Sequence, residues 1–298
     1  MARIRVTGTH GLPLACRVSS THRRIMIDLH CHYLPGVDDG APDLESGIAL
    51  VRAAAENGIR EAVLTPHILA GRWDNSRSSL EPRFDAFRQA VSEADIDIEL
   101  HLGAEVHLLP ESLALFEAGE LPALGSWDGR RVILLEFPDA CIPVGAIKAV
   151  EFLLQRGAVP MIAHPERNKE VMRSMAKIEP FVRAGCLLQL TAASVCGWFG
   201  KPAHQAALAL LDAGWATVVA TDAHSLRHRP PVLAEARHTL RTRYGLEAAE
   251  RLTQLNPAAI IAGRVEQSDG PAESARTQTC ASPGDADWQR PADPQALR

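Results

Sequence analysis

Two histidines, His30 and His32, directly follow a short apolar stretch near the start of the chain. Residues 26–29 predict a buried strand, and side chains alternate across a strand, so both histidines point to one side and Cys31 to the other. Two imidazoles on one rigid strand end can chelate a divalent metal ion with little reordering. Two ordinary polar residues at a strand end fit the same spacing, so the pair alone leaves both interpretations open.

More acidic and imidazole side chains follow the later apolar stretches. They are Asp38, Asp39, His67, Glu105, Glu136, His164, Asp222 and His224. A capped or solvated strand end explains any one of them but not the whole set, because carboxylates packed together repel unless cations neutralise them. The sequence therefore predicts a cluster of two or three divalent ions. Ligands of oxygen and imidazole type, without thiolate, suit Mn²⁺, iron or zinc, and such clusters clamp phosphoryl groups and activate water.

The elements that position these residues alternate regularly between short strands and helices. We expect a helix over 171–184, a loop over 70–79, and two closing helices over 231–243 and 246–263, the second broken at Asn256-Pro257. This alternation is typical of parallel α/β architecture, and barrel active sites are built at the carboxyl ends of the strands. We predict an α/β fold, a distorted (β/α)7 TIM-like barrel. An open doubly wound sheet is the alternative, but no Gly-rich phosphate loop follows the first strand.

Composition limits the class of protein. The chain has 298 residues, of which 46% are hydrophobic, as is ordinary for a globular protein. Its net charge of -5 gives no electrostatic reason to expect nucleic acid or an anionic membrane as a partner. No apolar run is long enough to insert into a membrane. The six cysteines form no C-x-x-C pair, as in a reduced cytoplasmic protein, and none precedes an arginine by six positions, so a cysteine-phosphatase loop is absent.

The two ends of the chain differ from the rest. Residues 1–25 show no clear period and predict a loose extension, with Met26 as an alternative start. Residues 265–298 are rich in small, polar and charged residues and predict a disordered tail. The catalytic domain is therefore expected over 26–264, and the oligomeric state stays open.

Several motifs resemble those of the polymerase-and-histidinol-phosphatase (PHP) superfamily. They are H-x-H at His30, T-P-H at His67, G-x-E at Glu105, H-P-E-R-N at His164 and D-A-H at Asp222. The opening D-x-H-x-H-x-x-P-G-x-D-D-G, Q-L-T-A-x-S, F-G-K and the R-P-P after D-A-H resemble one branch, the manganese-dependent protein-tyrosine phosphatases of bacterial capsule and exopolysaccharide operons. The resemblance runs from Met26 to about Gly263 and implies a PHP-type barrel.

The resemblance also implies how the ligands divide among the ions. One ion would be held by His30, His32, Glu105 and Asp222. Glu105 would bridge to a second ion held with Glu136 and His164. A third would take His67, His224 and one aspartate, for which Asp39 is favoured over Asp38. Amidohydrolases also begin with H-x-H, but His67 and the D-A-H pair count against them.

Two arginines, Arg167 and Arg229, complete the expected site, because a guanidinium fork matches the oxygens of a phosphoryl group. Arg227 is a rival for Arg229, and a surface cation is the alternative for each. We expect hydrolysis of phosphotyrosine by in-line attack of a metal-activated hydroxide, with a phosphotyrosyl protein, a bacterial tyrosine kinase of polysaccharide export, as substrate. The alternatives are a small-molecule phosphatase, such as one for histidinol phosphate, and a non-catalytic metal-binding module.

Three other features have no assigned role in this prediction. His101 and His107 alternate with Glu105, which makes each a candidate for the same side of the strand, but we expect them to be satisfied or exposed. Trp198-Phe199 fits either a wall of the substrate cleft, where an aromatic phosphoester stacks, or ordinary core packing.

Overall fold

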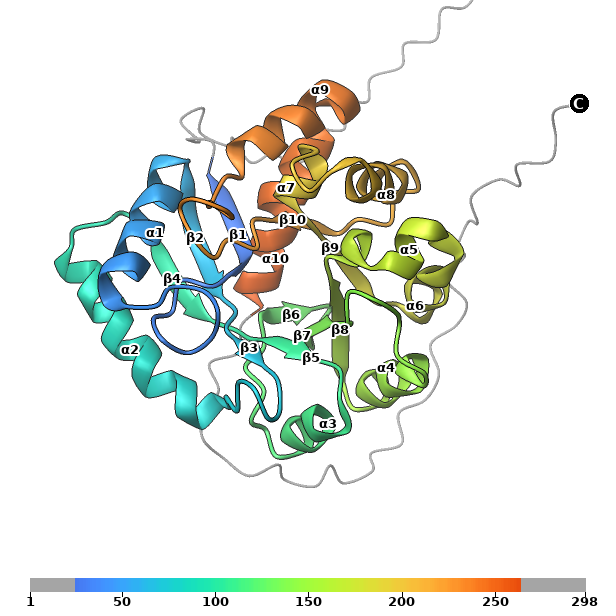
Figure 1. Cartoon of the computed structure of the whole chain (residues 1–298), viewed down its shortest axis with the longest axis horizontal. Helices are drawn as coiled ribbons and strands as arrows, with labels where there is room; N and C mark the ends of the chain where they lie inside the picture. Colours follow the sequence, from blue (N-terminus) through green and yellow to red (C-terminus); the bar gives the residue numbers. More distant parts are fainter. Residues whose placement is uncertain (1–24, 264–298) are drawn as a thin grey trace, which may run out of the picture. The chain divides into compact units, whose positions relative to one another are not determined.

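The structure is a computed structural model that describes residues 25–263, with strands at the centre and helices around them (Figure 1). The strands are β1 (Met26–Cys31), β2 (Ile59–Leu64), β3 (His67–Ile68), β4 (Glu99–Leu102), β5 (Glu105–His107), β6 (Gly125–Trp127), β7 (Arg130–Glu136), β8 (Ala158–Ala163), β9 (Leu187–Thr191) and β10 (Val218–Ala220). The predicted extension over 1–25 (apart from Ile25) and the predicted tail over 265–298 lie outside the described residues and stay predictions.

The helices connect successive strands in most cases. They are α1 (Leu44–Glu56), α2 (Arg77–Glu93), α3 (Pro110–Glu117), α4 (Ala146–Gln155), α5 (Lys169–Arg173), α6 (Glu179–Ala184), α7 (Ala192–Val195), α8 (Lys201–Asp212), α9 (Ala234–Glu250) and α10 (Asn256–Ala262). Single turns of 3₁₀-helix cover Pro165–Arg167 and Met175–Lys177, and a π-helical turn covers Arg251–Leu255. Within residues 25–263, no helix is both long and apolar enough to span a membrane.

The strands are parallel except β6, and they form two sheets, β1-β2-β4 and β10-β9-β8-β7-β5-β3. β3 follows β2 after two residues, and β5 follows β4 after two, so each pair continues one strand path from the first sheet into the second. At the other edge, the Asp222 amide donates to the His30 carbonyl (2.7 Å) and the His32 amide to the Ala223 carbonyl (2.9 Å). This order, which returns to β1, agrees with the α/β class and with the predicted distorted barrel.

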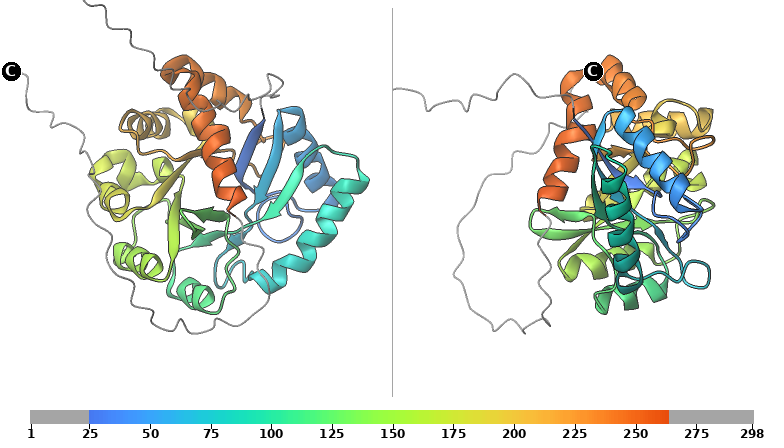
Figure 2. Two further views of the ribbon diagram at one scale, coloured as in Figure 1. Left: turned by 180° about the vertical axis from the view of Figure 1, so that it is seen from behind. Right: turned by 90° about the vertical axis from the view of Figure 1, so that its left-hand side faces the viewer.

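Apolar side chains pack on both sides of the strands. Ile27, Leu29, Val63 and Leu134 belong to one buried cluster, which α10 joins through Ile260. A second, larger cluster lies between the strands and the surrounding helices. Figure 2 shows α10 crossing behind the strands, on the side opposite the view of Figure 1. The strand ends are therefore fixed by packing from both sides before any site residue is added.

α10 approaches β6 so closely that the contact requires glycine. A Cβ on Gly125 would lie 2.0 Å from the Ile260 carbonyl oxygen, and its φ of 157° is one that glycine adopts freely. The hairpin from β6 to β7 turns at Asp128-Gly129, with φ values of 50° and 73°, as in a type I′ turn. The D-G dipeptide is a hairpin signal, and the sequence prediction missed this strand.

Three predicted boundaries are wrong. The expected helix over 171–184 is divided into α5, a 3₁₀ turn and α6, because Pro180 stands in the first turn of α6 and cannot continue a helix from before it. The expected loop over 70–79 contains the start of α2, which Ser76 caps through the Ser79 amide. The expected break at Asn256-Pro257 does not occur, since the backbone stays helical there and Pro257 occupies the first turn of α10, where its missing N–H is not needed.

Candidate metal centre and phosphate site

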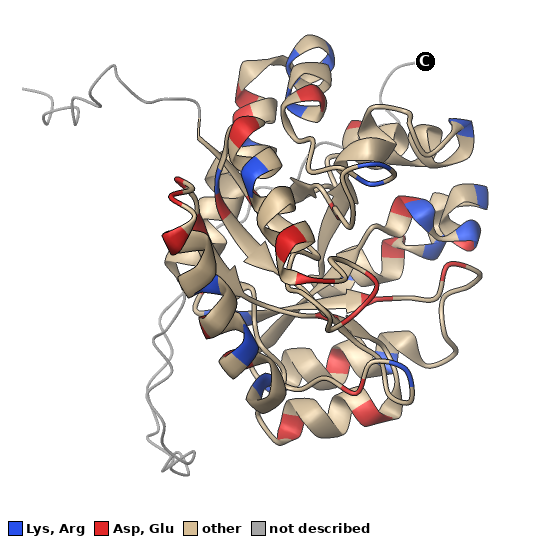
Figure 3. Cartoon of the chain, turned by 60° about the vertical axis from the view of Figure 1, so that its left-hand side comes forward, with Lys and Arg blue, Asp and Glu red and all other residues tan. Residues whose placement is uncertain are grey.

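The carboxyl ends of the strands bring all nine predicted ligands together. Each belongs to at least one group of ligand atoms that lie within 4.8 Å of one another, and we call these residues the rim cluster: His30, His32, Asp39, His67, Glu105, Glu136, His164, Asp222 and His224. Figure 3 shows acidic positions on strands and loops near the middle of the fold, with most basic positions on the surrounding helices and loops. The alternating pattern of β1 and the strand order together produce this arrangement.

The deepest part of the rim cluster joins β1 to Glu105 and Asp222. The Nε2 atom of His30 lies 3.1 Å from Glu105 Oε2 and 3.3 Å from Asp222 Oδ1. The Nε2 atom of His32 lies 3.3 Å and 3.5 Å from the same two oxygens. All four side chains are buried. Two imidazole nitrogens and two carboxylate oxygens thus converge on one small region.

Hydrogen bonds fix the orientation of three imidazoles of the rim cluster. His30 Nδ1 is 2.9 Å from Gln189 Oε1, His32 Nδ1 is 2.8 Å from Asp38 Oδ2, and His224 Nδ1 is 3.0 Å from the Asp222 carbonyl oxygen. Because each partner is an acceptor, each Nδ1 carries the proton and donates it. In the neutral form of each ring, the Nε2 lone pair then faces the cluster, which is the usual arrangement for imidazoles that bind a metal.

The two remaining groups lie on either side of the first. Glu105 Oε1 is 2.8 Å from His164 Nε2, and Glu136 Oε1 is 3.7 Å from the same nitrogen. Asp39 Oδ1 is 3.3 Å from His67 Nε2 and 3.5 Å from His224 Nε2. Glu105 therefore contacts both the first group and His164, as a bridging carboxylate would.

Asp38 and Asp39 have different surroundings. Both oxygens of Asp38 are used: Oδ2 accepts from His32 and from the His67 amide, and Oδ1 accepts from the Gly40 amide. Asp39 turns toward His67 and His224 instead. The turn that carries them packs tightly, since a Cβ on Gly40 would lie 2.1 Å from the His32 carbonyl oxygen. Asp38 therefore orients the His32 ring, whereas Asp39 directs an oxygen at His67 and His224.

The unpaired atoms of the rim cluster fit divalent cations. Five of its buried atoms have no hydrogen-bond partner: Glu105 Oε2, Glu136 Oε2, Asp222 Oδ1, His67 Nδ1 and His224 Nε2. Leaving such atoms unpaired costs several kcal/mol for a buried charge. Cations of the Mn²⁺, Fe²⁺ or Zn²⁺ type accept oxygen and imidazole ligands together and would satisfy these atoms.

The electrostatics of the cluster point the same way. Burial raises the pKa of Glu105, but the His30 and His67 imidazoles lower it more, so it ends well below its usual range. Burial also raises the pKa of Asp222, but the His30 imidazole and the Arg229 guanidinium lower it more, so it too ends well below its usual range. Burial lowers the pKa of His32, but Asp38 and Asp222 raise it well above the usual value. Without ions, the carboxylates rely on protons held by neighbouring imidazoles.

The two predicted arginines both contact Asp222. Arg167 Nη1 donates to Asp222 Oδ2 at 2.6 Å, and Arg229 Nη2 donates to the same oxygen. Both side chains are partly exposed, at 23% and 25%. Arg227, the rival of Arg229, is exposed to solvent. Asp222 therefore separates the two guanidinium groups from the imidazoles, with one oxygen facing each set.

Two of the proposed ligands sit in strained backbone. His164 has a φ of 29° and Asp222 a φ of 54°, in the left-handed region that residues other than glycine rarely adopt. Each follows the end of a strand, and the strain turns the chain sharply enough to bring the side chain into the rim cluster. Strain of this kind is retained where the surrounding structure holds it, most often at functional sites.

The sequence prediction missed two residues that contact the cluster. His107 contacts Glu136 through Nε2 and forms a group of nearby ligand atoms with His67 and Glu136. Its position two residues after Glu105 was the signal, because it places both side chains on one side of β5. Gln189 accepts from His30 Nδ1 and from the His164 amide (3.2 Å), a role that spacing in the sequence does not reveal.

The fold and the rim cluster together define a class: parallel α/β enzymes whose strand ends carry a carboxylate and imidazole cluster suited to metal-dependent hydrolysis. A family model for capsular polysaccharide synthesis, CpsB/CapC, matches residues 26–262. The chain therefore belongs to the CpsB/CapC family, which confirms the predicted capsule branch.

Known relatives agree with this assignment. The chain is 33% identical over 229 residues to the tyrosine-protein phosphatase YwqE of Bacillus subtilis, covering 77% of this chain and 89% of the relative. It is 29% identical over 241 residues to the tyrosine-protein phosphatase CpsB of Streptococcus pneumoniae, covering 79% and 98%.

Solved structures give the same result. One from a study of YwqE and CpsB, described as metal-dependent tyrosine phosphatases, has a TM-score of 0.75 at 31% identity and covers 84% of this chain and 100% of its own. The organophosphorus hydrolase from Deinococcus radiodurans, at 18% identity and a TM-score of 0.52, covers 80% and 92% and shares the fold.

Proposed function

We propose that this chain is a metal-dependent protein-tyrosine phosphatase that hydrolyses phosphotyrosine monoesters on a protein substrate. The observation that carries the proposal is the buried rim cluster, with unpaired carboxylate and imidazole atoms on one side of Asp222 and two arginines on the other. The relatives named as tyrosine-protein phosphatases support the same activity. Membership of a family described by capsular polysaccharide synthesis supports a bacterial tyrosine kinase as the substrate protein.

The proposed ligands are the nine residues of the rim cluster, in the division that the three groups suggest. Mn²⁺ is the ion we propose, from the resemblance to manganese-dependent phosphatases; oxygen and imidazole ligands without thiolate also suit iron or zinc. Bound divalent ions supply positive charge that polarises a phosphoryl oxygen and lowers the pKa of coordinated water. Free cysteines Cys31, Cys141, Cys186 and Cys196 support a cytoplasmic site of action, which we also propose.

Residues of the chain itself bind the phosphoryl group and orient the imidazoles. Arg167 and Arg229 are placed to bind the equatorial oxygens of the phosphoryl group, where charge accumulates during transfer. Gln189 and Asp38 hold the imidazoles of His30 and His32 in the tautomer that leaves Nε2 unprotonated. These contacts pre-form the site, so little reordering is needed when substrate binds.

The experiment that tests the proposed function uses the full-length chain loaded with Mn²⁺. It compares hydrolysis of a phosphotyrosyl peptide with hydrolysis of histidinol phosphate at equal concentrations, each with and without EDTA. We expect chelator-sensitive release of phosphate from the peptide at the higher kcat/KM. A preference for histidinol phosphate would replace the proposal with a small-molecule phosphatase, and no turnover of either would favour a binding module.

A further inference from the structure

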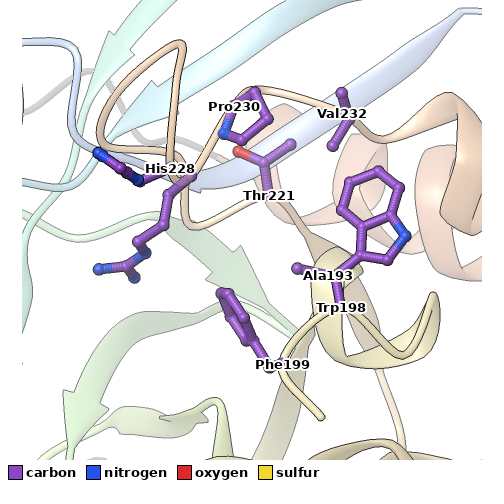
Figure 4. Close-up of a pocket in the computed structure, with 8 residues that line it drawn as sticks. Ala193, Trp198, Phe199, Thr221, His228, Pro230 and Val232 are labelled. Atoms are coloured by element: carbon purple, nitrogen blue, oxygen red, sulfur yellow. The ribbon is translucent and has the colours of Figure 1, made fainter.

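A small cavity lies next to the arginine side of the rim cluster. Its volume is about 140 Å³, and Trp198, Phe199, Pro230 and Val232 are among its lining residues. Figure 4 shows the Trp198 and Phe199 side chains, from the segment after α7, facing Pro230 and Val232 from the segment after β10. We call this cavity the ring pocket. Trp198, Phe199, Pro230 and Val232 give the pocket apolar surface, and Thr221, His228 and Arg229 give it polar surface.

The ring pocket and the phosphate-binding arginines are adjacent. Arg229 lines the pocket while its guanidinium contacts Asp222. The guanidinium carbon of Arg167 lies 5.2 Å from the centroid of the Phe199 ring, which is within the range of a cation–π contact. A phosphoryl group bound by these two arginines therefore has its ester oxygen near the mouth of the ring pocket, beside its aromatic side chains.

The size of the pocket matches one aromatic ring. An apolar cavity of about 150 Å³ in another protein binds benzene, so about 140 Å³ is enough for a phenyl group. Aromatic rings pack well against other rings in tilted or offset arrangements, which Trp198 and Phe199 can provide. Trp198 is 53% exposed, so its apolar surface is available to a ligand. A short alkyl phosphoester would leave most of this surface uncovered.

A second, larger cavity on the other side of the rim cluster is less suitable for the ring. It has a volume of about 470 Å³ and is lined by residues of β3, α3 and the segments between them, including Trp73, His107 and Leu109. No arginine lines it, and it is about three times larger than one ring needs. It suits flanking residues of a peptide better than the phosphorylated side chain.

We propose that the ring pocket binds the phenyl ring of phosphotyrosine and gives the site its preference for aryl over alkyl phosphomonoesters. The inference rests on the proposed function and adds the residues that select the substrate. Phe199 is the specificity-determining residue, because its ring contacts both the pocket and Arg167.

Binding of two phosphonates to the Mn²⁺-loaded full-length chain, measured by calorimetry, tests this proposal without requiring turnover. Benzylphosphonate carries a methylene in place of the ester oxygen and a phenyl ring, whereas methylphosphonate lacks the ring. We expect the wild type to prefer benzylphosphonate, and Phe199→Ala to weaken that ligand about tenfold with methylphosphonate unchanged. Ala193→Phe, which fills the pocket, should have the same selective effect, and Phe199→Tyr should retain the preference.

Leu109→Ala in the larger cavity is the matched control and should leave both affinities unchanged. Equal weakening of both ligands by Phe199→Ala would mean that Phe199 only supports Arg167. A selective loss of benzylphosphonate affinity in Leu109→Ala would place the phenyl ring in the larger cavity. Either result would overturn the proposal that the ring pocket binds the phenyl ring. An unchanged preference in both Phe199→Ala and Ala193→Phe, each shown to be folded by circular dichroism, overturns it as well. A wild type that keeps the benzyl preference but does not hydrolyse a phosphotyrosyl peptide would overturn only the proposed function.

Discussion

Acids and imidazoles gather at both ends of the strands, and the two groups behave differently. At the carboxyl ends lies the rim cluster. Toward the amino ends of β2 and β4 lies a second group, Glu61, Glu99 and His101, which we call the lower group. In the lower group, His101 Nε2 is 3.7 Å from Glu61 Oε2 and 3.8 Å from Glu99 Oε1. Residue types and spacing alone would make both groups candidate metal sites.

Burial separates them. Glu105 and Asp222 in the rim cluster are each 1% exposed, whereas Glu99 in the lower group is 69% exposed and Glu61 31%. The pKa of Glu105 is driven well below its usual range by imidazoles, while the pKa of Glu61 is raised, first by burial and then by Glu99. Solvent can hydrate the charges of the lower group, and protonation of Glu61 can remove one of them. In the rim cluster, water reaches Asp39, which is 46% exposed, but not Glu105 or Asp222, so these two buried carboxylates need cations.

The largest expected effect that tests this contrast is metal removal. Dialysis against EDTA should lower phosphatase activity to below about one thousandth, because chelation removes the charge that polarises the phosphoryl oxygen. Adding Mn²⁺ should restore it. Elemental analysis of wild type and of the Glu61→Gln, Glu99→Gln double variant should give equal metal content. Full activity in EDTA, or metal lost from the double variant, would reverse the roles of the two groups.

A matched pair of histidine variants comes next. His164→Ala should lower kcat/KM by more than about 100-fold, since it removes a proposed ligand that contacts Glu105 at 2.8 Å. His101→Ala in the lower group should change kcat/KM less than about twofold. The measurement is phosphate release from a phosphotyrosyl peptide at saturating Mn²⁺. Similar losses in the two variants would show that burial does not distinguish the groups.

The arginines should give a smaller effect. Arg229→Lys keeps the positive charge but loses the planar fork, so kcat/KM should fall by about tenfold. Arg227→Lys, at an exposed position two residues away, is the matched control and should behave as wild type. The comparison is made on the same peptide with both constants determined. A larger loss in Arg227→Lys would exchange the roles assigned to the two positions.

Much of the fold and of the site was predictable because local rules determined it. Alternation on β1 placed His30 and His32 on one side, and the regular succession of strands and helices indicated the α/β class. The positions of the rim-cluster residues followed from motifs at strand ends, and their role as metal ligands stays a prediction. His107 was undervalued because a histidine near a strand end is usually satisfied by solvent, and only the packing of β5 beside β7 brings it to Glu136.

Other features depend on contacts between distant parts of the chain. Gln189 orients His30 across 159 positions of sequence, and no local pattern reports that distance. The choice between Asp38 and Asp39 depends on which one the His67 amide and the His32 ring occupy. The lower group could not be told from the rim cluster either, since exposure is a property of the folded chain.

The smallest expected effect is a pH dependence of stability that separates the two groups. In the metal-free protein, His32 and His164 have pKa values raised above the ordinary 6.5, so their contribution is complete below pH 6.5 and is lost as pH rises through the raised values. The pKa of His224 is lowered to about 4, so its contribution is lost only as pH falls from 6.5 toward 4. Above pH 6.5, metal-free protein should therefore become less stable.

Metal ions replace those protons, and the metal-loaded protein should keep its stability over the same range. The difference in Tm between the two forms should grow by about 5 °C between pH 6.5 and 8.5, as followed by circular dichroism. Burial and Glu99 raise the pKa of Glu61 above the ordinary 4.5. Its contribution to stability is therefore lost as pH rises from 4.5, whereas the loss from His32 and His164 begins at pH 6.5. Glu61→Gln should therefore alter the stability profile as pH rises from 4.5 and leave the difference in Tm between the metal-free and metal-loaded forms intact. A Tm difference that stays constant from pH 6.5 to 8.5 would mean that protons on the rim imidazoles do not stand in for cations.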